Sequence, residues 1–394
     1  MSTPTSSTNP LIRAWYDKET RSVIVQIIAA ALIISFFAFI INNAVVNLSN
    51  IGKDINFSFL WDNASYDINQ HLIEYSSTSS HFRAMIVGLI NTLLVAVAGI
   101  VLATILGFIL GVMRLSRNWL TQKIAYVYIE YMRNVPVLLH ILLLHGLIVT
   151  SLPRPKGSYN FGDTFYLNNR GFQMPSPEFQ SLFWIVGGFV VAGLAFAWWF
   201  SRYAQNVQDK TGKAYPVALI NLAAIILIPL IVYFALGSPI EWDVPALKGF
   251  NFKGGMVVRP EFIALWLALS LYTAAFIGEI VRAGIVAIDH GQTEAAQALG
   301  ISNSQVLKLV VIPQGLRVII PPLTSQYLNL AKNSSLALAI GYMDIVATIG
   351  GISLNQTGRE MECMLIVMAT YLVISLLISS GMNWYNNRMK LVER

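Results

Sequence analysis

Long apolar runs dominate the chain, and their lengths predict helices that cross a membrane. A helix needs about 20 mostly apolar residues to span a bilayer. Eight segments meet this requirement: 22–52, 84–113, 134–153, 179–201, 214–240, 262–288, 316–342 and 363–387. The third is the shortest and suffices if its helix begins near Tyr126. The sixth and seventh carry charges but remain long and apolar enough to cross.

The runs are continuous rather than alternating, which favours helices over the strands of a membrane barrel. Composition agrees, because only 12% of the residues are charged, whereas soluble domains carry roughly 25%. The first run is too long for the apolar core of a secretory signal and lacks an Ala-x-Ala end, so we expect it to be retained. The sequence therefore predicts an all-α membrane protein with about eight transmembrane helices.

The distribution of basic residues predicts the orientation. Eight spans place both termini on one side, and putting them inside leaves fifteen Lys and Arg residues inside against nine outside, with Arg133 and Lys332 within spans. Cytoplasmic loops carry the excess of such residues, so we expect both termini in the cytoplasm. The cations lie at helix ends rather than in one patch, which argues against a nucleic-acid partner.

Four segments describe the organisation along the chain. Residues 1–83 hold an N-terminal tail, the first span and a polar loop, and residues 84–150 form the first part of a core. Residues 151–260 contain two spans between loops rich in Gly, Pro and aromatic residues, so they begin and end on one side and are typical of an insertion. Residues 261–394 complete the core. Gly107 and Gly111 form a small-xxx-small surface, which we interpret as ordinary helix packing ahead of a dimer seam.

A polar hairpin, residues 289–313, separates two of the spans. Glu294 to Leu299 are strong helix formers, and Gly300 is suited to end that helix in a left-handed conformation. Ser302 and Gln305 match a capping box for a second helix. Pro313 lacks a backbone donor and predicts a kink where the chain returns to the membrane. On this pattern alone, an ordinary loop between helices is an equal alternative.

The order of residues in the hairpin resembles a known family. Glu294-Ala295-Ala296, Gly300 and the pair Ile312-Pro313 resemble the signature loop of permeases of ATP-binding-cassette (ABC) importers. Further segments resemble permeases for polar amino acids, of the histidine and glutamine permease type: 88–93, 131–136, 279–292, 313–317, 321–324 and 332–336. The first span and the 151–260 insertion resemble the larger permease of a heterodimeric pair in general L-amino-acid import systems.

The resemblance implies a five-helix permease core with an added N-terminal helix and a two-helix insertion, in a bacterial inner membrane. It implies import of polar L-amino acids from periplasm to cytoplasm by alternating access. The implied partners are a second homologous permease, a cytoplasmic ABC ATPase dimer, a periplasmic amino-acid-binding protein and the lipid bilayer. The sequence has no Gly-x-x-x-x-Gly-Lys-Ser/Thr loop, so ATP and Mg are expected in the ATPase, with no cofactor and no enzyme activity in this chain.

Two sets of site residues follow. The resemblance implies that the ATPase is coupled through Glu294, Ala295, Ala296, Gly300 and Pro313. Polar groups inside spans are costly and usually face protein or water, so the substrate-path candidates are Lys332, Asn333, Ser334, Ser335, Asn91, Thr92 and Tyr272. Hydrogen bonding between helices is the alternative for this second set. No residues are spaced as a catalytic group or a metal site.

Two pairs of opposite charges stand three residues apart, Glu130 with Arg133 and Glu279 with Arg282. Each pair can meet on one helix face, and we expect the partners to neutralise each other rather than to bind a ligand. A different function class stays open at this point: an ion-coupled secondary amino-acid transporter would need no ATPase, but it would leave the polar hairpin without a purpose. A membrane-embedded enzyme would need a cluster of reactive side chains, which the sequence does not show.

Overall fold

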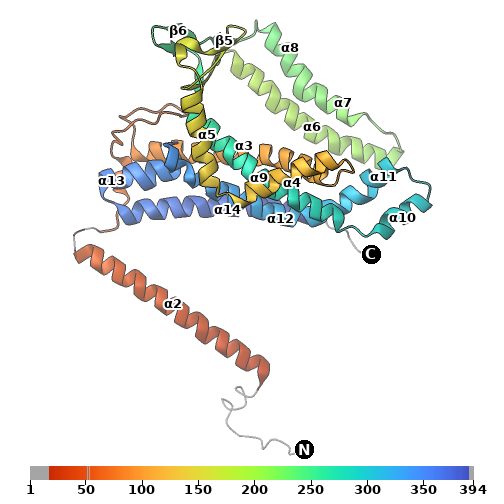
Figure 1. The fold of residues 1–394 in the computed structure, drawn as a ribbon, viewed down its shortest axis with the longest axis horizontal. Helices are drawn as coiled ribbons and strands as arrows, with labels where there is room; N and C mark the ends of the chain where they lie inside the picture. The colour runs from red at the N-terminus through yellow and green to blue at the C-terminus, as the bar shows by residue number, and fades with distance from the viewer. Residues whose placement is uncertain (1–16, 51, 53, 390–394) are drawn as a thin grey trace, which may run out of the picture. The chain divides into compact units, whose positions relative to one another are not determined.

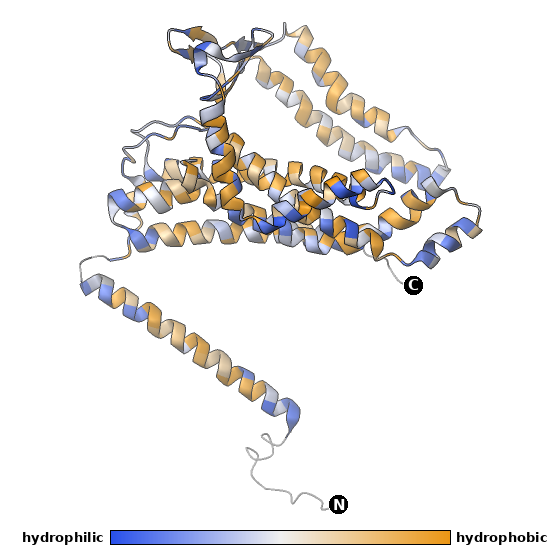
Figure 2. Ribbon diagram, in the orientation of Figure 1, coloured by the Kyte–Doolittle hydropathy of each residue, from blue (hydrophilic) through white to orange (hydrophobic). Residues whose placement is uncertain are grey.

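The computed structural model describes residues 17–50, 52 and 54–389, so most of the predicted N-terminal tail lies outside the described residues. The described chain is mostly helical, which confirms the predicted class (Figure 1). Seven described helices are long and apolar enough to cross a membrane: Lys18–Asn47, His81–Arg114, Phe183–Thr211, Val217–Ala235, Pro260–Val286, Ser304–Ile340 and Glu360–Arg388. Figure 2 shows their hydrophobic character along most of their length.

The helices have the following bounds: α2 Lys18–Asn50, α3 His81–Arg114, α4 Trp119–Asn134, α5 Val137–Ser151, α6 Phe183–Thr211, α7 Val217–Leu222, α8 Ile228–Ala235, α9 Pro260–Val286, α10 His290–Ala298, α11 Asn303–Val306, α12 Ile312–Asn333, α13 Leu354–Thr357 and α14 Glu360–Met389. The chain divides into two units, Met1–Leu89 with Ile345–Val373, and Ile90–Asp344 with Ile374–Arg394. Helices α3 and α14 contribute residues to both.

The third predicted span is not one continuous helix. Helices α4 and α5 meet at an angle of 104°, and the two residues between them, Val135 and Pro136, have extended backbone angles. Proline has no backbone donor and disfavours helical geometry in the residue before it. The expectation of a single helix running from Tyr126 is therefore wrong, and the described chain has seven continuous spans, or eight if this bent pair crosses once.

Two other prolines are accommodated by wider helical turns. Residues Ala223–Leu227 and Leu307–Val311 form π-helical turns, and each is followed within two residues by a proline, Pro229 or Pro313, in the first turn of the next α-helix. The wider turn moves the backbone carbonyls away from the proline ring, which lacks a donor for them. The helix from Ser304 to Ile340 passes through this wider turn as one apolar span, and the kink expected at Pro313 stays a prediction.

The outer loops of the insertion contain short strands that the sequence analysis did not predict. Their bounds are β1 Tyr159–Phe161, β2 Phe165–Asn168, β3 Gly171–Met174, β4 Ser176–Phe179, β5 Ile240–Asp243, β6 Ala246–Lys248, β7 Asn251–Lys253 and β8 Met256–Val258. One antiparallel sheet has the order β1-β2-β3-β8, and two further two-stranded sheets pair β4 with β5 and β6 with β7. We call residues 154–179 and 239–258 the strand subdomain.

Pairing within the strand subdomain joins the two ends of the insertion. Strand β3 pairs with β8, and β4 pairs with β5. These pairs tie the segment that follows α5 to the segment that precedes α9. The end of α5 and the start of α9 therefore lie at the same small subdomain.

Helix α9 is the centre of the larger unit. It packs against α4, α5 and α12 and buries Leu265, Leu269 and Ile277 almost completely. On α3, a Cβ atom added to Gly107 would lie 2.4 Å from Cγ2 of Ile277, and one added to Gly111 would lie 2.6 Å from Cβ of Val281. The small-xxx-small surface therefore packs within this chain, which confirms the interpretation as helix packing.

The smaller unit is held by a compact polar network over a small apolar core. Its core includes Phe59, Ile345, Ile349, Cys363 and Val367. Nearby, Nδ1 of His81 lies 2.8 Å from Oγ of Ser353, and the hydroxyl of Tyr66 lies 3.1 Å from the same atom. Burial raises the pKa of Tyr66 to about 12, so its hydroxyl stays protonated. The polar loop before α3 is thus folded onto the segment that precedes α14.

Candidate functional site

The first half of the polar hairpin is a well-capped helix. Oδ1 of Asp289 accepts a hydrogen bond from the backbone of Gly291 at 2.6 Å, so α10 begins at His290, four residues before Glu294. At its other end, Gly300 donates to the carbonyl of Gln297 at 2.9 Å and Ile301 donates to that of Ala296 at 3.3 Å. These two bonds form a Schellman motif. Gly300 has φ +77°, which confirms the predicted left-handed turn.

The second half of the hairpin is capped as the sequence predicts, with one difference. The side chain of Gln305 accepts from the backbone of Ser302 at 3.3 Å, which is one half of a capping box. The difference is that the Ser302 hydroxyl donates to the same Gln305 oxygen at 2.9 Å, whereas a capping-box hydroxyl accepts from the backbone. Helix α11 then leads through the π-helical turn into α12. Both ends of the turn around Gly300 are therefore fixed by local hydrogen bonds.

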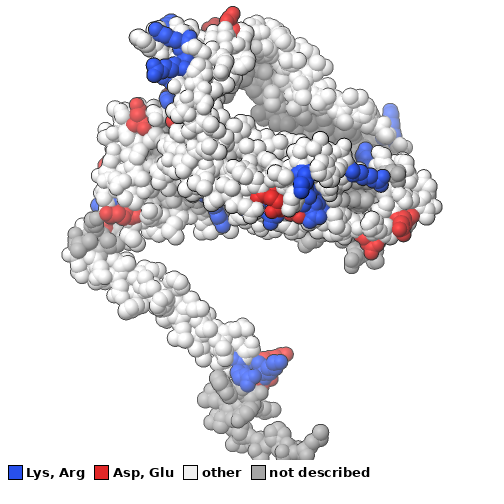
Figure 3. Space-filling model, viewed as in Figure 1, with Lys and Arg blue, Asp and Glu red and all other residues white. Residues whose placement is uncertain are grey.

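The hairpin has an inner and an outer face. Ala296 and Val306 are buried, with 6% and 2% of their surface exposed, so they hold the two short helices together. Glu294, Ala295 and Gly300 are exposed, and Leu299 has 80% of its surface exposed. The outer face thus offers a carboxylate and an apolar tip to a partner, and Figure 3 shows the acidic side chains over α10.

The hairpin joins two helices of the core directly. It lies between α9 and α12, which pack against each other, and Nε2 of Gln314 on α12 lies 3.3 Å from Oε1 of Gln292 on α10. Because its internal turn is fixed, a displacement of α10 must be passed to these two helices. The arrangement is suited to transmit movement from a partner into the membrane.

Three of the predicted path residues are buried in the helix packing. Asn91 and Thr92 on α3 and Ser334 at the end of α12 are fully buried. Nδ2 of Asn91 donates to the carbonyl of Met343 at 2.9 Å, and the Tyr342 hydroxyl donates to the carbonyl of Asn91 at 3.1 Å. The Ser334 hydroxyl donates to the carbonyl of Ala331 at 2.8 Å. Their burial favours a structural role for the three side chains.

The other four path candidates are more accessible and lie in two places. Lys332 is exposed, and Asn333 and Ser335 are partly exposed, where α12 gives way to a 3₁₀-helix over Ser334–Ile340. Tyr272 on α9 is partly exposed, and its ring centre lies 6.3 Å from that of His140 and 5.0 Å from that of Phe276. Tyr272 thus belongs to an aromatic cluster on α9 and α5. The buried Asn91, in contrast, contacts Met343, which follows the 3₁₀-helix.

The two charge pairs form as predicted, and one of them has a third partner. Nε of Arg282 lies 2.8 Å from Oε1 of Glu279, and Nη1 of Arg133 lies 4.0 Å from Oε1 of Glu130. Arg114 on α3 also lies 4.0 Å from Oε2 of Glu279. Sequence spacing cannot show this contact, because it joins two helices that are far apart in the chain.

A small cavity lies beside these pairs. Its volume is about 210 Å³, and it is lined by Arg133, Phe276, Glu279, Ile280, Ala283 and Gln326. A cation from α4, a carboxylate from α9 and an amide from α12 meet there. Both charges belong to the pairs that the sequence predicts to neutralise each other. Gln326 was not among the predicted residues, and its only signal was its polarity within a span.

The helices are long and apolar enough to span a membrane, a polar hairpin joins two of the core helices, and a small charged cavity lies among them. These features together define a transport permease. Residues 99–391 match the family of binding-protein-dependent transport system inner membrane components, and the chain belongs to that family. It is therefore a multi-pass membrane protein and the permease subunit of an ABC importer.

Similar proteins match the chain along almost its whole length. It is 47% identical over 381 residues to the general L-amino acid transport system permease protein AapQ of Rhizobium johnstonii, covering 97% of this chain and 95% of that protein. It is 47% identical over 414 residues to the glutamate/glutamine/aspartate/asparagine transport system permease protein BztB of Rhodobacter capsulatus, covering 96% of each. These matches include the first span and the insertion, and they lend no support to the ion-coupled alternative.

Proposed function

We propose that this chain carries polar L-amino acids from the periplasm to the cytoplasm as one permease of a heterodimeric ABC importer. The observation that carries the proposal is the similarity to AapQ across 97% of the chain, because it extends beyond the shared core into the first span and the insertion. BztB, which is named for the transport of glutamate, glutamine, aspartate and asparagine, supports the same substrate class.

The outer face of α10 docks on a cytoplasmic ATPase dimer, which binds ATP and Mg. Glu294 and Ala295 make the contact, while Ala296 and Gly300 fix the angle of the hairpin through their packing and backbone bonds. Pro313 stands at the start of α12, where the hairpin joins the span. When the ATPase closes, the hairpin moves as a rigid body, α9 and α12 tilt, and access alternates between the two sides of the membrane.

Three further partners complete the importer. A second homologous permease forms the other half of the pathway, a periplasmic amino-acid-binding protein delivers the substrate, and the bilayer surrounds the apolar helices. Both termini and the hairpin lie in the cytoplasm, as the excess of basic residues on that side supports. The strand subdomain then lies on the periplasmic side.

The substrate path runs along the accessible polar groups of the core. Tyr272, Lys332, Asn333 and Ser335 line it, whereas the buried Asn91, Thr92 and Ser334 support the helices behind it. The 210 Å³ cavity belongs to the same path, since Arg133 and Glu279 complement the carboxylate and the ammonium group of an amino acid.

Replacing Arg133 with glutamine is expected to slow uptake by the complete importer roughly tenfold or more, because a hydrogen bond to a charged group contributes about 1.5–3 kcal/mol. The measurement is the initial uptake rate per assembled complex. Ser334→Ala is the matched comparison: it should lower the amount or thermal stability of the complex and leave the rate per complex unchanged. An Arg133→Gln importer with the wild-type rate would remove the cavity from the path.

Reconstitution tests the function itself. The chain in lipid vesicles, alone or with the second permease, the ATPase and the binding protein, is supplied with radiolabelled glutamine, glutamate and histidine. Uptake is expected only for the complete complex with ATP on the side of the ATPase. Uptake by this chain alone, driven by a sodium or proton gradient, would contradict the proposal and favour the ion-coupled transporter.

A further inference from the structure

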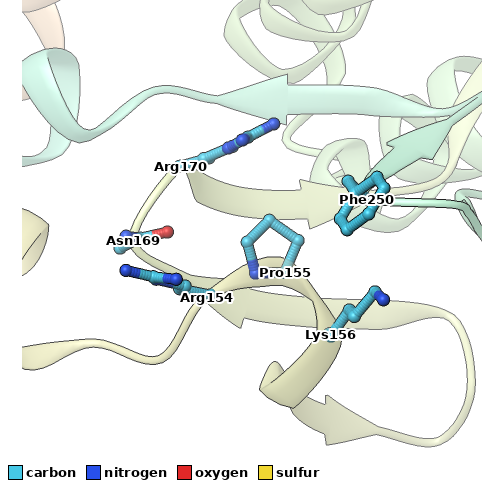
Figure 4. Close-up of a pocket in the computed structure, with 6 residues that line it drawn as sticks. All are labelled: Arg154, Pro155, Lys156, Asn169, Arg170 and Phe250. Carbon is cyan, nitrogen blue, oxygen red and sulfur yellow. The ribbon is translucent and has the colours of Figure 1, made fainter.

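The strand subdomain contains a cationic pocket that the transport mechanism does not use. Its volume is about 380 Å³, and it is lined by Arg154, Pro155, Lys156, Asn169, Arg170 and Phe250. Figure 4 shows Arg154 with Asn169 at one end and Lys156 with Phe250 at the other, with Pro155 between them. No carboxylate lines this pocket, and Figure 3 shows basic side chains gathered over the subdomain.

Buried hydrogen bonds fix the frame of the pocket. The side chain of Asn168 is fully buried; it donates to Oγ of Ser158 at 3.0 Å and accepts from the backbone of Arg170 at 2.8 Å. The Ser158 hydroxyl in turn donates to the carbonyl of Pro155 at 2.7 Å. The turn that carries Arg154 and Lys156 is thereby fastened to the turn that carries Arg170, so the three cations line one pocket before any ligand binds.

The charges of the pocket are suited to an oxyanion. Within the described residues, none of its three cations makes an ion pair with a carboxylate, and Nζ of Lys156 lies 4.3 Å from the centre of the Phe250 ring. Like charges around one pocket repel one another, and a bound anion relieves that repulsion. The guanidinium fork matches the oxygens of a phosphate. Oδ1 of Asn169 is buried without a hydrogen-bond partner, so it would accept from a hydroxyl beside the anion.

The position of the pocket favours a membrane lipid as the source of that anion. Arg154 follows Ser151, the last residue of α5, by three positions, which is at most about 11 Å of chain. The opposite wall of the pocket, which carries Arg170, is held close to the start of α9. Gly171 packs so closely on the end of β8 that an added Cβ atom would lie 2.2 Å from the carbonyl oxygen of Val258. The headgroup layer on each side of a bilayer is roughly 5–8 Å thick. The pocket therefore opens within reach of the phosphates.

Exposed aromatic side chains on the same subdomain agree with this placement. Tyr159, Phe161 and Phe250 have 56%, 55% and 78% of their surfaces exposed. Aromatic residues gather at the boundary between membrane and water, where their rings lie at headgroup level. We propose that the pocket binds the phosphate of an anionic phospholipid whose headgroup carries hydroxyl groups, the chemistry of phosphatidylglycerol. The bound lipid anchors the strand subdomain, and with it the ends of α5 and α9, to the bilayer surface.

The test measures lipid bound to the purified importer complex by native mass spectrometry. The complex is stripped of lipid and titrated with phosphatidylglycerol, with phosphatidylcholine or with inorganic phosphate. We expect one tightly held phosphatidylglycerol per copy of this chain, and binding at least tenfold weaker in an R154Q/R170Q variant, since each basic side chain near an anionic membrane surface contributes appreciably. K248Q/K253Q removes two exposed charges from the same subdomain outside the pocket and should bind as the wild type does.

Other variants keep the result interpretable. R154K/R170K preserves the charge and should retain the lipid, whereas a fold defect in the glutamine variant would appear as loss of the assembled complex. Equal retention of phosphatidylglycerol by wild type and R154Q/R170Q would overturn the proposal. Saturation by inorganic phosphate with no preference for phosphatidylglycerol would also overturn it, by assigning the pocket to a free anion. If R154Q/R170Q lost only stimulation by the binding protein, the pocket would be a protein contact instead.

Discussion

Glu294→Lys is expected to reduce ATP-driven uptake by two orders of magnitude or more and to release the ATPase from the permease. Glu294 is exposed on α10, so lysine creates no clash in the isolated chain, and both residues are good helix formers. The change therefore acts on the partner surface alone. A charge that is reversed at a docked interface meets a partner arranged for the opposite sign, and such pairs cost several kcal/mol.

Two readouts separate this effect from a folding defect. Co-purification of the ATPase with the tagged permease should fail, while the permease pair itself assembles and melts at the wild-type temperature. Glu178→Lys makes the same charge reversal at an exposed position of β4, far in sequence from the hairpin, and should leave association and uptake intact. Retained ATPase association and uptake in Glu294→Lys would exclude the hairpin as the coupling element.

The hairpin could be predicted from sequence because its geometry depends on neighbours in the chain. The helix ends through bonds from Gly300 to Gln297 and from Ile301 to Ala296, and Ser302 is capped by Gln305. Each of these contacts spans five residues or fewer. The predicted start was four residues late because the cap supplied by Asp289 was not recognised.

Contacts between distant segments could not be predicted in this way. The strands of the insertion pair residues up to about eighty positions apart, as Met174 pairs with Met256, and each strand is too short to show alternation. Arg114 reaches Glu279 only because α3 and α9 pack together. The break between α4 and α5 is different, since Pro136 was visible in the sequence and its effect on Val135 was not weighed.

Polarity within a span likewise does not reveal whether a side chain supports the helices or lines a path. Asn91 and Lys332 both carry polar nitrogen donors inside apolar runs, yet Asn91 is fully buried and bonded to a backbone carbonyl while Lys332 is exposed. The difference depends on which neighbouring helix covers each residue. The coupling and path residues therefore stay predictions, with burial now dividing the second set into supporting and accessible groups.

Gly107→Leu is expected to be a severely damaging change in the core. Its new side chain would have to occupy space where even a Cβ atom would lie 2.4 Å from Cγ2 of Ile277, with the carbonyl oxygen of Ala274 at 3.2 Å. Close helix approach in membranes depends on small residues at the contact, and the backbone oxygen cannot move aside alone. Overpacking of this kind costs about 3 kcal/mol or more, so α3 must separate from α9.

The expected result is a large loss of folded permease, measured as the yield and melting temperature of the purified complex. Gly187→Leu is the matched control, since Gly187 on α6 has no atom within 4 Å of its Cβ position, and it should be tolerated. Gly107→Leu combined with Ile277→Ala removes the obstructing side chain and should recover part of the stability, giving a coupling energy that only residues in contact show. Additive losses in the double variant would mean that Gly107 does not face Ile277, and the α3–α9 packing described above would have to be redrawn.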